Sequence, residues 1–390
     1  MIIDDSIIIL VANYRLSNDK LNTNLMKSNK NNYCVIMAGG VGARFWPMSK
    51  TSRPKQFIDV LGIGKTLIRL TFERFTNICP AENILVVTNK IYKDLVLSQL
   101  PELKEQQVLC EPSRRNTAPC VAYANYKIKA ENPNAIIVVA PSDHIILKED
   151  EFVRNIKTAM KAAEENDWLL TLGIKPSRPD TGYGYIQFME ENAYADNIPL
   201  HKVKTFTEKP SLEIAQSFLA SGDFLWNSGI FIWSLSSIMT AFNDLLPDVD
   251  CLFEKGVGVY NTTEEESFIA ETYAVCKNIS IDYGVMEKAK NVFTLAVDFG
   301  WSDLGTWGSL YTIRNKDENQ NTTVGKNVML YNTENCIMNM PNDKLVVLQG
   351  LDDYIVVEED NTLLVCKKED EQQIRQFVAD VKVEKGEKYI

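Results

Sequence analysis

Short apolar runs alternate with longer segments of helical periodicity from about residue 33 to residue 314. This alternation is typical of a mostly parallel sheet that is covered by helices on both faces. The clearest strands are expected at 34–37, 84–88, 135–140 and 169–174, and helices between them at 66–75, 90–100, 119–129 and 152–164. We therefore predict an α/β fold of Rossmann-like type, in which ligands gather beyond the carboxyl ends of the strands.

The pattern changes after residue 314. A polar stretch at 315–322 is typical of a linker, and short β-like runs follow at 324–331, 336–340, 345–348, 354–357 and 363–366. An amphipathic helix comes next, with Ile374, Phe377 and Val381 on one face. We see no clean repeat in this region. The expected organisation is a flexible N-terminal extension over residues 1–32, a catalytic domain over 33–314 and a small β-rich domain over 323–390.

Composition narrows the function classes. The chain has 390 residues, 45% of them hydrophobic and 24% charged, as expected of a globular enzyme. Its net charge of −11 argues against a nucleic-acid partner, so anionic substrates need a locally basic site. Eight cysteines show no metal-ligand or disulfide spacing, and we expect reduced, buried thiols. No apolar run approaches the ~20 residues needed to cross a membrane, and we expect a cytoplasmic protein.

A glycine-rich segment follows the first expected strand. Gly39, Gly40 and Gly42 let backbone N–H groups approach an anion closely, because no Cβ stands in the way. Arg44 and Lys55 add positive charge beside this loop. The combination predicts a grip for the phosphates of a nucleoside triphosphate.

Two generic readings of the glycines fit less well. A dinucleotide fingerprint starting at Gly40 meets Phe45 where its third glycine belongs. A Walker A loop ending in Gly64-Lys65-Thr66 would need a glycine at position 59, which is Asp59. We therefore prefer the triphosphate grip to both.

A carboxylate follows another buried strand. Asp143 ends the run 136–140 within Pro-Ser-Asp-His, and Mg²⁺ commonly takes one or two carboxylates together with substrate phosphates. The alternative for Asp143 is a helix N-cap. His144, beside it, has no partner histidine or catalytic serine nearby in sequence, and we interpret it as structural.

Several phrases together resemble one family. The glycine loop with Arg44, Trp-Pro and Pro-Lys-Gln-Phe at 54–57 resembles the signature of mannose-1-phosphate guanylyltransferases, also called GDP-mannose pyrophosphorylases. Similar phrases lie at 111–119, 181–185, 208–210, 226–231 and 299–307. The resemblance implies a nucleotidyltransferase domain with a mixed sheet, a short left-handed β-helix that helps pair subunits in a homodimer, and transfer of GMP from GTP to mannose-1-phosphate.

The resemblance also implies residue roles. Arg44 and Lys55 would be catalytic, and Asp303 would join Asp143 as the second ligand of Mg²⁺, with Mn²⁺ as a substitute; sequence spacing alone does not join these two aspartates. The implied nucleotide-binding residues are Ala38, Gly39, Gly40, Gly42, Glu111, Pro112, Arg115, Asn116, Thr117, Ala118 and Ser142. The implied sugar-phosphate-binding residues are Gly182, Tyr183, Gly184, Glu208, Lys209, Asn227, Ser228 and Gly229, and Asp282 resembles a further element near the sugar.

Two alternatives stay open. One is a sugar-1-phosphate nucleotidyltransferase of the same fold that uses a different base or hexose. The other is a sugar-nucleotide sensor that binds without turnover. The presence of Arg44 and Lys55 together with Asp143 and Asp303 disfavours a sensor, which has little need of the whole metal constellation.

Overall fold

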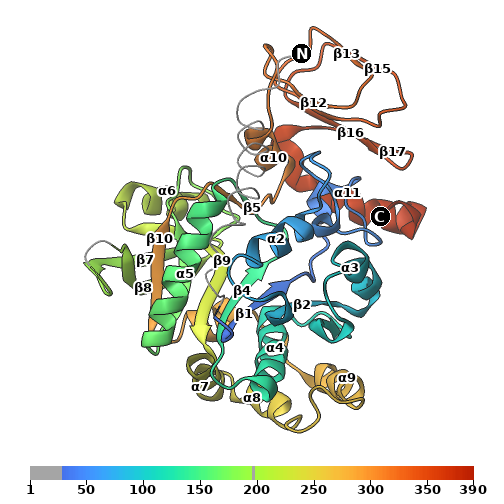
Figure 1. The fold of residues 1–390 in the computed structure, drawn as a ribbon. Helices are drawn as coiled ribbons and strands as arrows, with labels where there is room; N and C mark the ends of the chain where they lie inside the picture. Colours follow the sequence, from blue (N-terminus) through green and yellow to red (C-terminus); the bar gives the residue numbers. More distant parts are fainter. Residues whose placement is uncertain (1–28, 196–197) are drawn as a thin grey trace, which may run out of the picture.

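A mixed sheet forms the centre of the computed structural model, which describes residues 29–195 and 198–390. Within these residues the sheet has nine strands in the order β3-β2-β1-β4-β9-β6-β10-β8-β7 (Figure 1). β8 and β9 run opposite to the other strands, so the expected mostly parallel, mixed sheet is confirmed. The strands are β1 (Asn32–Met37), β2 (Ile84–Asn89), β3 (Val108–Glu111), β4 (Ile136–Pro141), β6 (Leu169–Ile174), β7 (Gly184–Asn192), β8 (Leu200–Glu208), β9 (Phe224–Ser234) and β10 (Val292–Val297).

Helices cover both faces of this sheet because successive side chains of a strand point to opposite faces. In β1, Cys34 and Ile36 pack into one buried cluster, while Tyr33 and Val35 pack into another. The first cluster includes α2 (Leu67–Phe75), α3 (Lys93–Gln99) and α5 (Glu149–Glu165). The second includes α4 (Thr117–Glu131), α7 (Leu235–Leu245), α8 (Pro247–Glu254) and α9 (Glu265–Val275). The carboxyl edge of the sheet is thereby left for the loops.

The predicted elements mostly hold, with shifted ends. The strand expected at 169–174 is β6, and α4 begins at Thr117, two residues before the expected start. The segment 90–100 begins as a 3₁₀ turn, Lys90–Tyr92, before α3. Asn32, placed in the N-terminal extension, pairs with Ile136 as the first residue of β1. The rest of the extension, up to residue 28, lies outside the described residues.

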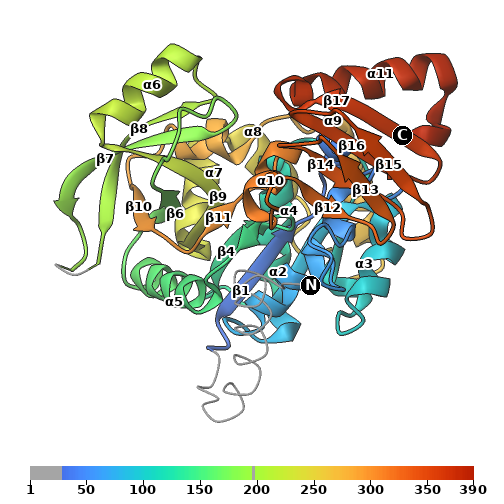
Figure 2. The same ribbon diagram turned by 90° about the horizontal axis from the view of Figure 1, so that it is seen from above.

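The C-terminal strands form a β-helix-like unit, as expected (Figure 2). One of its sheets has the order β12-β14-β16-β17, and the other pairs β13 with β15. Partner residues are 18 positions apart in two of the pairings, as in Ile337 with Ile355 and Val328 with Val346, so a period that the sequence did not reveal governs the stacking. The strands are β12 (Thr322–Val324), β13 (Val328–Tyr331), β14 (Ile337–Asn339), β15 (Val346–Gln349), β16 (Tyr354–Glu359) and β17 (Thr362–Lys367).

Two expectations for this unit change. The run expected at 324–331 splits, because Gly325 adopts a φ of 129° and turns the chain between β12 and β13. The expected linker at 315–322 ends inside β12, and Asn321 is buried, with its Nδ2 donating to the carbonyl of Thr333 at 2.8 Å. The linker is therefore packed against the β-helix.

The β-helix also packs on the glycine-loop region. Phe45 and Trp46 share a buried cluster with Ile337, Ile355 and residues of α11 (Ile374–Lys385). The Trp46 indole donates to the Tyr389 carbonyl at 2.6 Å. In both views the β-helix lies apart from α6 (Leu212–Ser221), with α10 (Trp307–Ile313) between them (Figures 1 and 2).

Candidate active site

The loops that carry the predicted chemistry meet at the carboxyl edge of the sheet. The glycine loop follows β1, Glu111 is the last residue of β3, and Asp143 follows β4, three strands that run parallel. A small antiparallel pair brings in the distant aspartate: β5 (Ile145–Ile146) pairs with β11 (Trp301–Ser302). Ser302 lies opposite Ile145, so Asp303 comes close to Asp143 although 160 positions separate them.

Lys55 ties the two aspartate loops together. Its Nζ lies 2.8 Å from Asp143 Oδ2 and donates to the carbonyls of Asp303 and Leu304, each at 2.9 Å. The side chain is only 5% exposed, so this ammonium is held in one place. Arg44 reaches the same loop, where its Nη1 donates to the Gly305 carbonyl at 3.3 Å. Both predicted catalytic cations therefore converge on 303–305.

The glycine loop is shaped by a close approach to Lys55. Gly42 has a φ of 70°, and a Cβ added there would lie 2.5 Å from the Lys55 Cβ. Gln56, which the sequence analysis did not single out, donates from Nε2 to the carbonyls of Ala38 and Gly40, both at 2.9 Å. Its place directly after Lys55 in the Pro-Lys-Gln-Phe phrase was the available signal. These bonds use the loop's carbonyls and leave backbone N–H groups for an anion.

Asp303 is oriented by two donors. Tyr183 O–H donates to Asp303 Oδ1 at 2.7 Å, and the Gly305 N–H donates to the same oxygen at 3.0 Å. Burial raises the pKa of Tyr183, and the negative charge of Asp303 raises it further, so the phenol stays protonated and keeps donating. Tyr183, assigned to the sugar phosphate, thus also supports the candidate metal ligand.

Asp143 stays ionised for a different reason. Burial is the largest influence and raises the pKa of its carboxyl. The charge and hydrogen bond of Lys55, together with His144 and a backbone hydrogen bond, outweigh it and hold the pKa below its usual value. His144 next to it accepts a bond at Nδ1 from the Trp301 indole at 3.1 Å. Burial lowers the pKa of His144, and the ring packs edge-on against Trp301 at 5.4 Å. This geometry supports the structural interpretation of His144.

The segment 111–118 is built against α9 and the chain that follows it. Glu111 accepts from Tyr273 O–H at 3.0 Å, and burial raises the pKa of Glu111 to about 7. A Cβ added at Gly39 would lie 3.4 Å from Glu111 Oε2, which places this carboxyl beside the glycine loop. Asn116 has a φ of 68°, and its Oδ1 accepts from the Thr117 N–H at 3.0 Å. The predicted base-binding residues therefore lie on a fixed turn.

Other members of this segment are engaged within the protein. Arg115 donates from Nε to the Tyr273 carbonyl at 3.0 Å and from Nη2 to the Ala274 carbonyl at 3.2 Å. Thr117 Oγ1 accepts from the Ile281 N–H at 2.9 Å, and Ala118 is fully buried. Pro112 is exposed, whereas Ser142 is buried, and the Ser142 N–H donates to the Met37 carbonyl at 3.0 Å. Their nucleotide contacts stay predictions, and for Arg115 a role in fixing the turn fits the bonds better.

The sugar-side residues lie on neighbouring strands. Gly184 pairs with Glu208, and a Cβ at Gly184 would lie 2.4 Å from Glu208 Oε2. The ammonium of Lys209, at a φ of 47°, pairs with Glu208 and is largely exposed. Gly182 donates its N–H to Asp180 Oδ1 at 2.8 Å. A side chain at 184 would therefore displace the carboxylate of Glu208.

Asn227 is held on three sides. Its Oδ1 accepts from Thr171 Oγ1 and from the Gly229 N–H, both at 3.1 Å, and its Nδ2 donates to Asp282 Oδ1 at 2.8 Å. Burial and the charge of Glu208 raise the pKa of Asp282 to about 6. One Nδ2 hydrogen of Asn227 remains for a ligand.

Ser228 is buried, and its Oγ accepts from the Ile230 N–H at 3.3 Å. This bond leaves the hydroxyl hydrogen of Ser228 free to donate, and its predicted sugar-phosphate contact stays a prediction. Thr171 and Asp282 hold the side chain of Asn227 by hydrogen bonds. Of these two residues, the sequence analysis singled out only Asp282.

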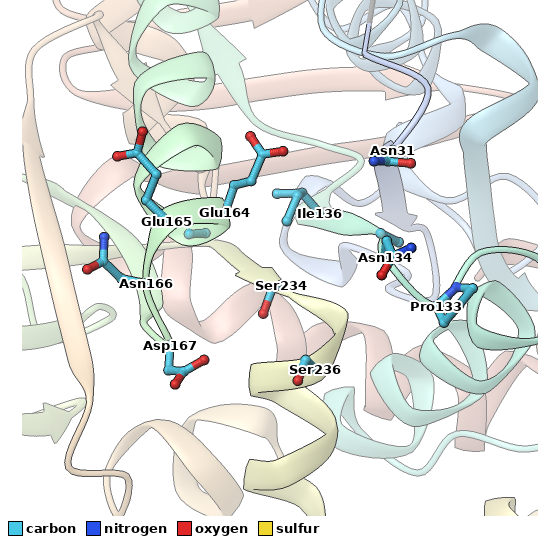
Figure 3. Close-up of a pocket in the computed structure, with 12 residues that line it drawn as sticks. Asn31, Pro133, Asn134, Ile136, Glu164, Glu165, Asn166, Asp167, Ser234 and Ser236 are labelled. Carbon is cyan, nitrogen blue, oxygen red and sulfur yellow. The ribbon is translucent and has the colours of Figure 1, made fainter.

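A cavity of about 610 Å³ lies elsewhere (Figure 3). Asn31, Ile136 and Asp167 among its lining residues precede or begin β1, β4 and β6, so it lies at the amino edge of the sheet. Glu164 and Glu165 add negative charge to its wall, which does not suit an anionic nucleotide. The chemistry gathers at the opposite edge.

Comparison with known proteins decides the family. Residues 33–320 match the model of the nucleotidyl transferase family, and residues 325–381 match the MannoseP isomerase/GMP-like beta-helix domain. The chain belongs to the nucleotidyl transferase family. This nucleotidyl transferase is 37% identical over 369 residues to the mannose-1-phosphate guanylyltransferase of Salmonella montevideo, covering 91% of its own length and 75% of the relative's. The resemblance inferred from the motifs is confirmed.

Further relatives agree. The alginate biosynthesis protein AlgA of Pseudomonas aeruginosa is 34% identical over 354 residues, covering 89% of this chain and 71% of AlgA. A crystal structure titled mannose-1-phosphate geranyltransferase, from Thermus thermophilus, has a TM-score of 0.80 and 28% identity, covering 90% of this chain and 99% of that one. Among the described residues no helix is long and apolar enough to cross a membrane.

Proposed function

We propose that this nucleotidyl transferase moves GMP from GTP to mannose-1-phosphate, giving GDP-mannose and diphosphate. The observation that carries the proposal is the convergence of Arg44 and Lys55 on the loop of Asp303, with Asp143 bound to the same ammonium. Two cations and two carboxylates at one sheet edge suit a reaction in which two anions must meet. The mannose-1-phosphate guanylyltransferases among the relatives support the choice of base and hexose.

The site has a donor set that fits Mg²⁺. Within the described residues no group of three or more histidine, cysteine or carboxylate side chains gathers, so a fully protein-built metal cage is absent there. Mg²⁺ commonly takes only one or two carboxylates and completes its shell with phosphates and water. Asp143 and Asp303 would hold the ion, or Mn²⁺ in its place, and it would neutralise charge on the phosphates.

The protein's own groups have distinct tasks in this scheme. A phosphate oxygen of mannose-1-phosphate attacks the α-phosphorus of GTP. The bond between the α-phosphorus and the α–β bridging oxygen breaks, and this oxygen leaves with the diphosphate. No general base is needed, because the attacking phosphate is already ionised at neutral pH. Arg44 and Lys55 would offset the charge of the two anions, and the glycine-loop N–H groups would hold the triphosphate in line.

We also propose that the enzyme is a cytoplasmic homodimer. An apolar sheet face supports pairing through the β-helix: Met329 lies opposite Val347 in the β13–β15 pair, and both side chains are about half exposed, as is Tyr331. GTP, the proposed substrate, is made in the cytoplasm. Light scattering at several protein concentrations tests the pairing, and a monomer throughout would contradict it.

The decisive assay for the function is diphosphate release with mannose-1-phosphate and each of GTP, ATP, UTP and dTTP. We expect a strong preference for GTP, since a buried site that hydrogen-bonds one base leaves polar groups unpaired with another. Equal or better turnover with UTP or dTTP would assign the chain to a different sugar nucleotide. Binding of GDP-mannose without any turnover would favour the sensor.

A further inference from the structure

Arg178 lies in the loop between β6 and β7, on the sugar side of the site. Its guanidinium carbon is 5.3 Å from the centre of the Trp226 ring and 5.9 Å from that of the Tyr183 ring. Tyr183 donates to Asp303, and Trp226 directly precedes Asn227 in β9. Arg178 therefore contacts the ring of Tyr183, which bonds the candidate metal ligand Asp303. It also contacts the ring of Trp226, the residue before the predicted hexose contact Asn227.

Asp180 fixes the guanidinium in this position. Arg178 donates from Nε at 3.0 Å and from Nη2 at 2.7 Å to Asp180 Oδ2. The other carboxylate oxygen accepts from the Gly182 N–H, and the Asp180 carbonyl accepts from Tyr185 O–H at 3.0 Å. The carboxylate is therefore anchored to the same turn that begins β7.

The charge of Arg178 nonetheless remains available. The side chain is 51% exposed, and Asp180 uses only the Nε and Nη2 side of the fork. Arginine suits phosphate because its planar group offers several N–H donors in fixed directions. Lys209, which donates its N–H to the Tyr183 carbonyl at 3.2 Å, is likewise paired with an acid, Glu208.

We propose that Arg178 binds the phosphate of the incoming sugar phosphate, at the side of the site that Arg44 and Lys55 do not reach. This inference rests on the proposed function, because it assumes that a sugar phosphate approaches along β7 and β9. Stacking on Tyr183 and Trp226 holds the guanidinium ready before the ligand arrives, which limits the entropy lost on binding.

The test compares binding of mannose-1-phosphate with binding of mannose by calorimetry, in the full chain. Arg178→Met is expected to weaken mannose-1-phosphate about 10- to 100-fold, the loss typical of a hydrogen bond to a charged group, while mannose binding stays unchanged. Arg178→Lys should recover part of the loss, because it returns the charge without the fork. The matched control is Arg154→Met, which removes an exposed guanidinium of α5 that is likewise paired with a nearby acid, Glu151.

Kinetics separate binding from an indirect effect through Tyr183. We expect the KM for mannose-1-phosphate to rise in Arg178→Met, with the KM for GTP and the Mg²⁺ dependence as in the wild type. Wild-type affinity for mannose-1-phosphate in Arg178→Met would overturn the inference. So would an equal loss of mannose binding or a shifted Mg²⁺ dependence, which would mean that Arg178 acts by supporting Tyr183 and Asp303. Turnover by the wild type tests the proposed function separately, so an active wild type with an unaffected Arg178→Met contradicts this inference alone.

Discussion

Removing the Lys55 ammonium is the most direct test of the site. Its Nζ has three oxygen partners within 2.9 Å, on Asp143, Asp303 and Leu304. Lys55→Met keeps most of the side-chain volume and deletes the charge. The change leaves Asp143 without its cation and two carbonyls without their donor.

The expected loss of stability follows from burial. Breaking a fully buried ion pair typically costs about 3–5 kcal/mol, since the remaining charge is left uncompensated. Asp143 is 31% exposed, so water can partly rehydrate it, and we expect about 2–3 kcal/mol. With an unfolding entropy of about 2.1 cal/mol/K per residue, this corresponds to a fall in Tm of about 3 °C.

Lys55→Met should lower kcat strongly, although its expected loss of stability is moderate. Loss of one preplaced charge at the reacting phosphates typically costs about a hundredfold or more in kcat. Lys127→Met is the matched control, because Lys127 on α4 is as buried as Lys55. Its Nζ donates to both carboxylate oxygens of Glu265 on α9, at 2.7 and 2.8 Å. We expect it to lose at least as much stability as Lys55→Met while keeping its kcat.

Diphosphate release at saturating substrates, run beside thermal melts of both variants, measures the two effects. If the kcat of Lys55→Met stayed within about tenfold of the Lys127→Met value, Lys55 would be a structural link and the proposed role in charge compensation would be wrong.

Three further predictions concern the same site. Asp143→Ala and Asp303→Ala should each lower turnover at least about a hundredfold, which is more than the loss of a residue that only supports a metal ligand would cause. Near-wild-type activity with unchanged Mg²⁺ dependence in either variant would show that this aspartate does not belong to the site. The pKa of Glu111 is raised to about 7, so the folded protein keeps a proton on this carboxyl at pH values where the unfolded protein has released it. The contribution of Glu111 to the free energy of unfolding is therefore complete below the pKa of an unfolded glutamate and is lost as the pH rises to about 7. Glu111→Gln should therefore gain stability relative to the wild type as urea melts move from pH 5 to pH 8, and a difference independent of pH would contradict the assignment. Gly42→Ala should be less stable than Gly40→Ala by about 1–2 kcal/mol, because only Gly42 has a positive φ and a crowded Cβ position, and equal melts of the two variants would refute this.

The sequence determined the parts of the site that are local. A buried strand followed by glycines, and another followed by Asp143, predict loops at the carboxyl edge of a parallel sheet, because parallel strands present their carboxyl ends at one edge. The continuous apolar runs of β1 and β4 were likewise readable, because a central parallel strand is buried on both faces. Only resemblance to a family brought in Asp303.

Tertiary structure decided what these residues touch. Asp303 meets Asp143 because two-residue strands, β5 and β11, pair across the fold, and pairs that short leave no periodic signal in a sequence. Arg115 donates to carbonyls of α9, 158 positions further along the chain, a partner that no local pattern specifies. The 18-residue stacking of the β-helix leaves little sequence signal for a similar reason. Its short strands β13 and β15 carry apolar residues at exposed as well as half-buried positions, so no apolar–polar alternation marks the repeat, and backbone register defines it.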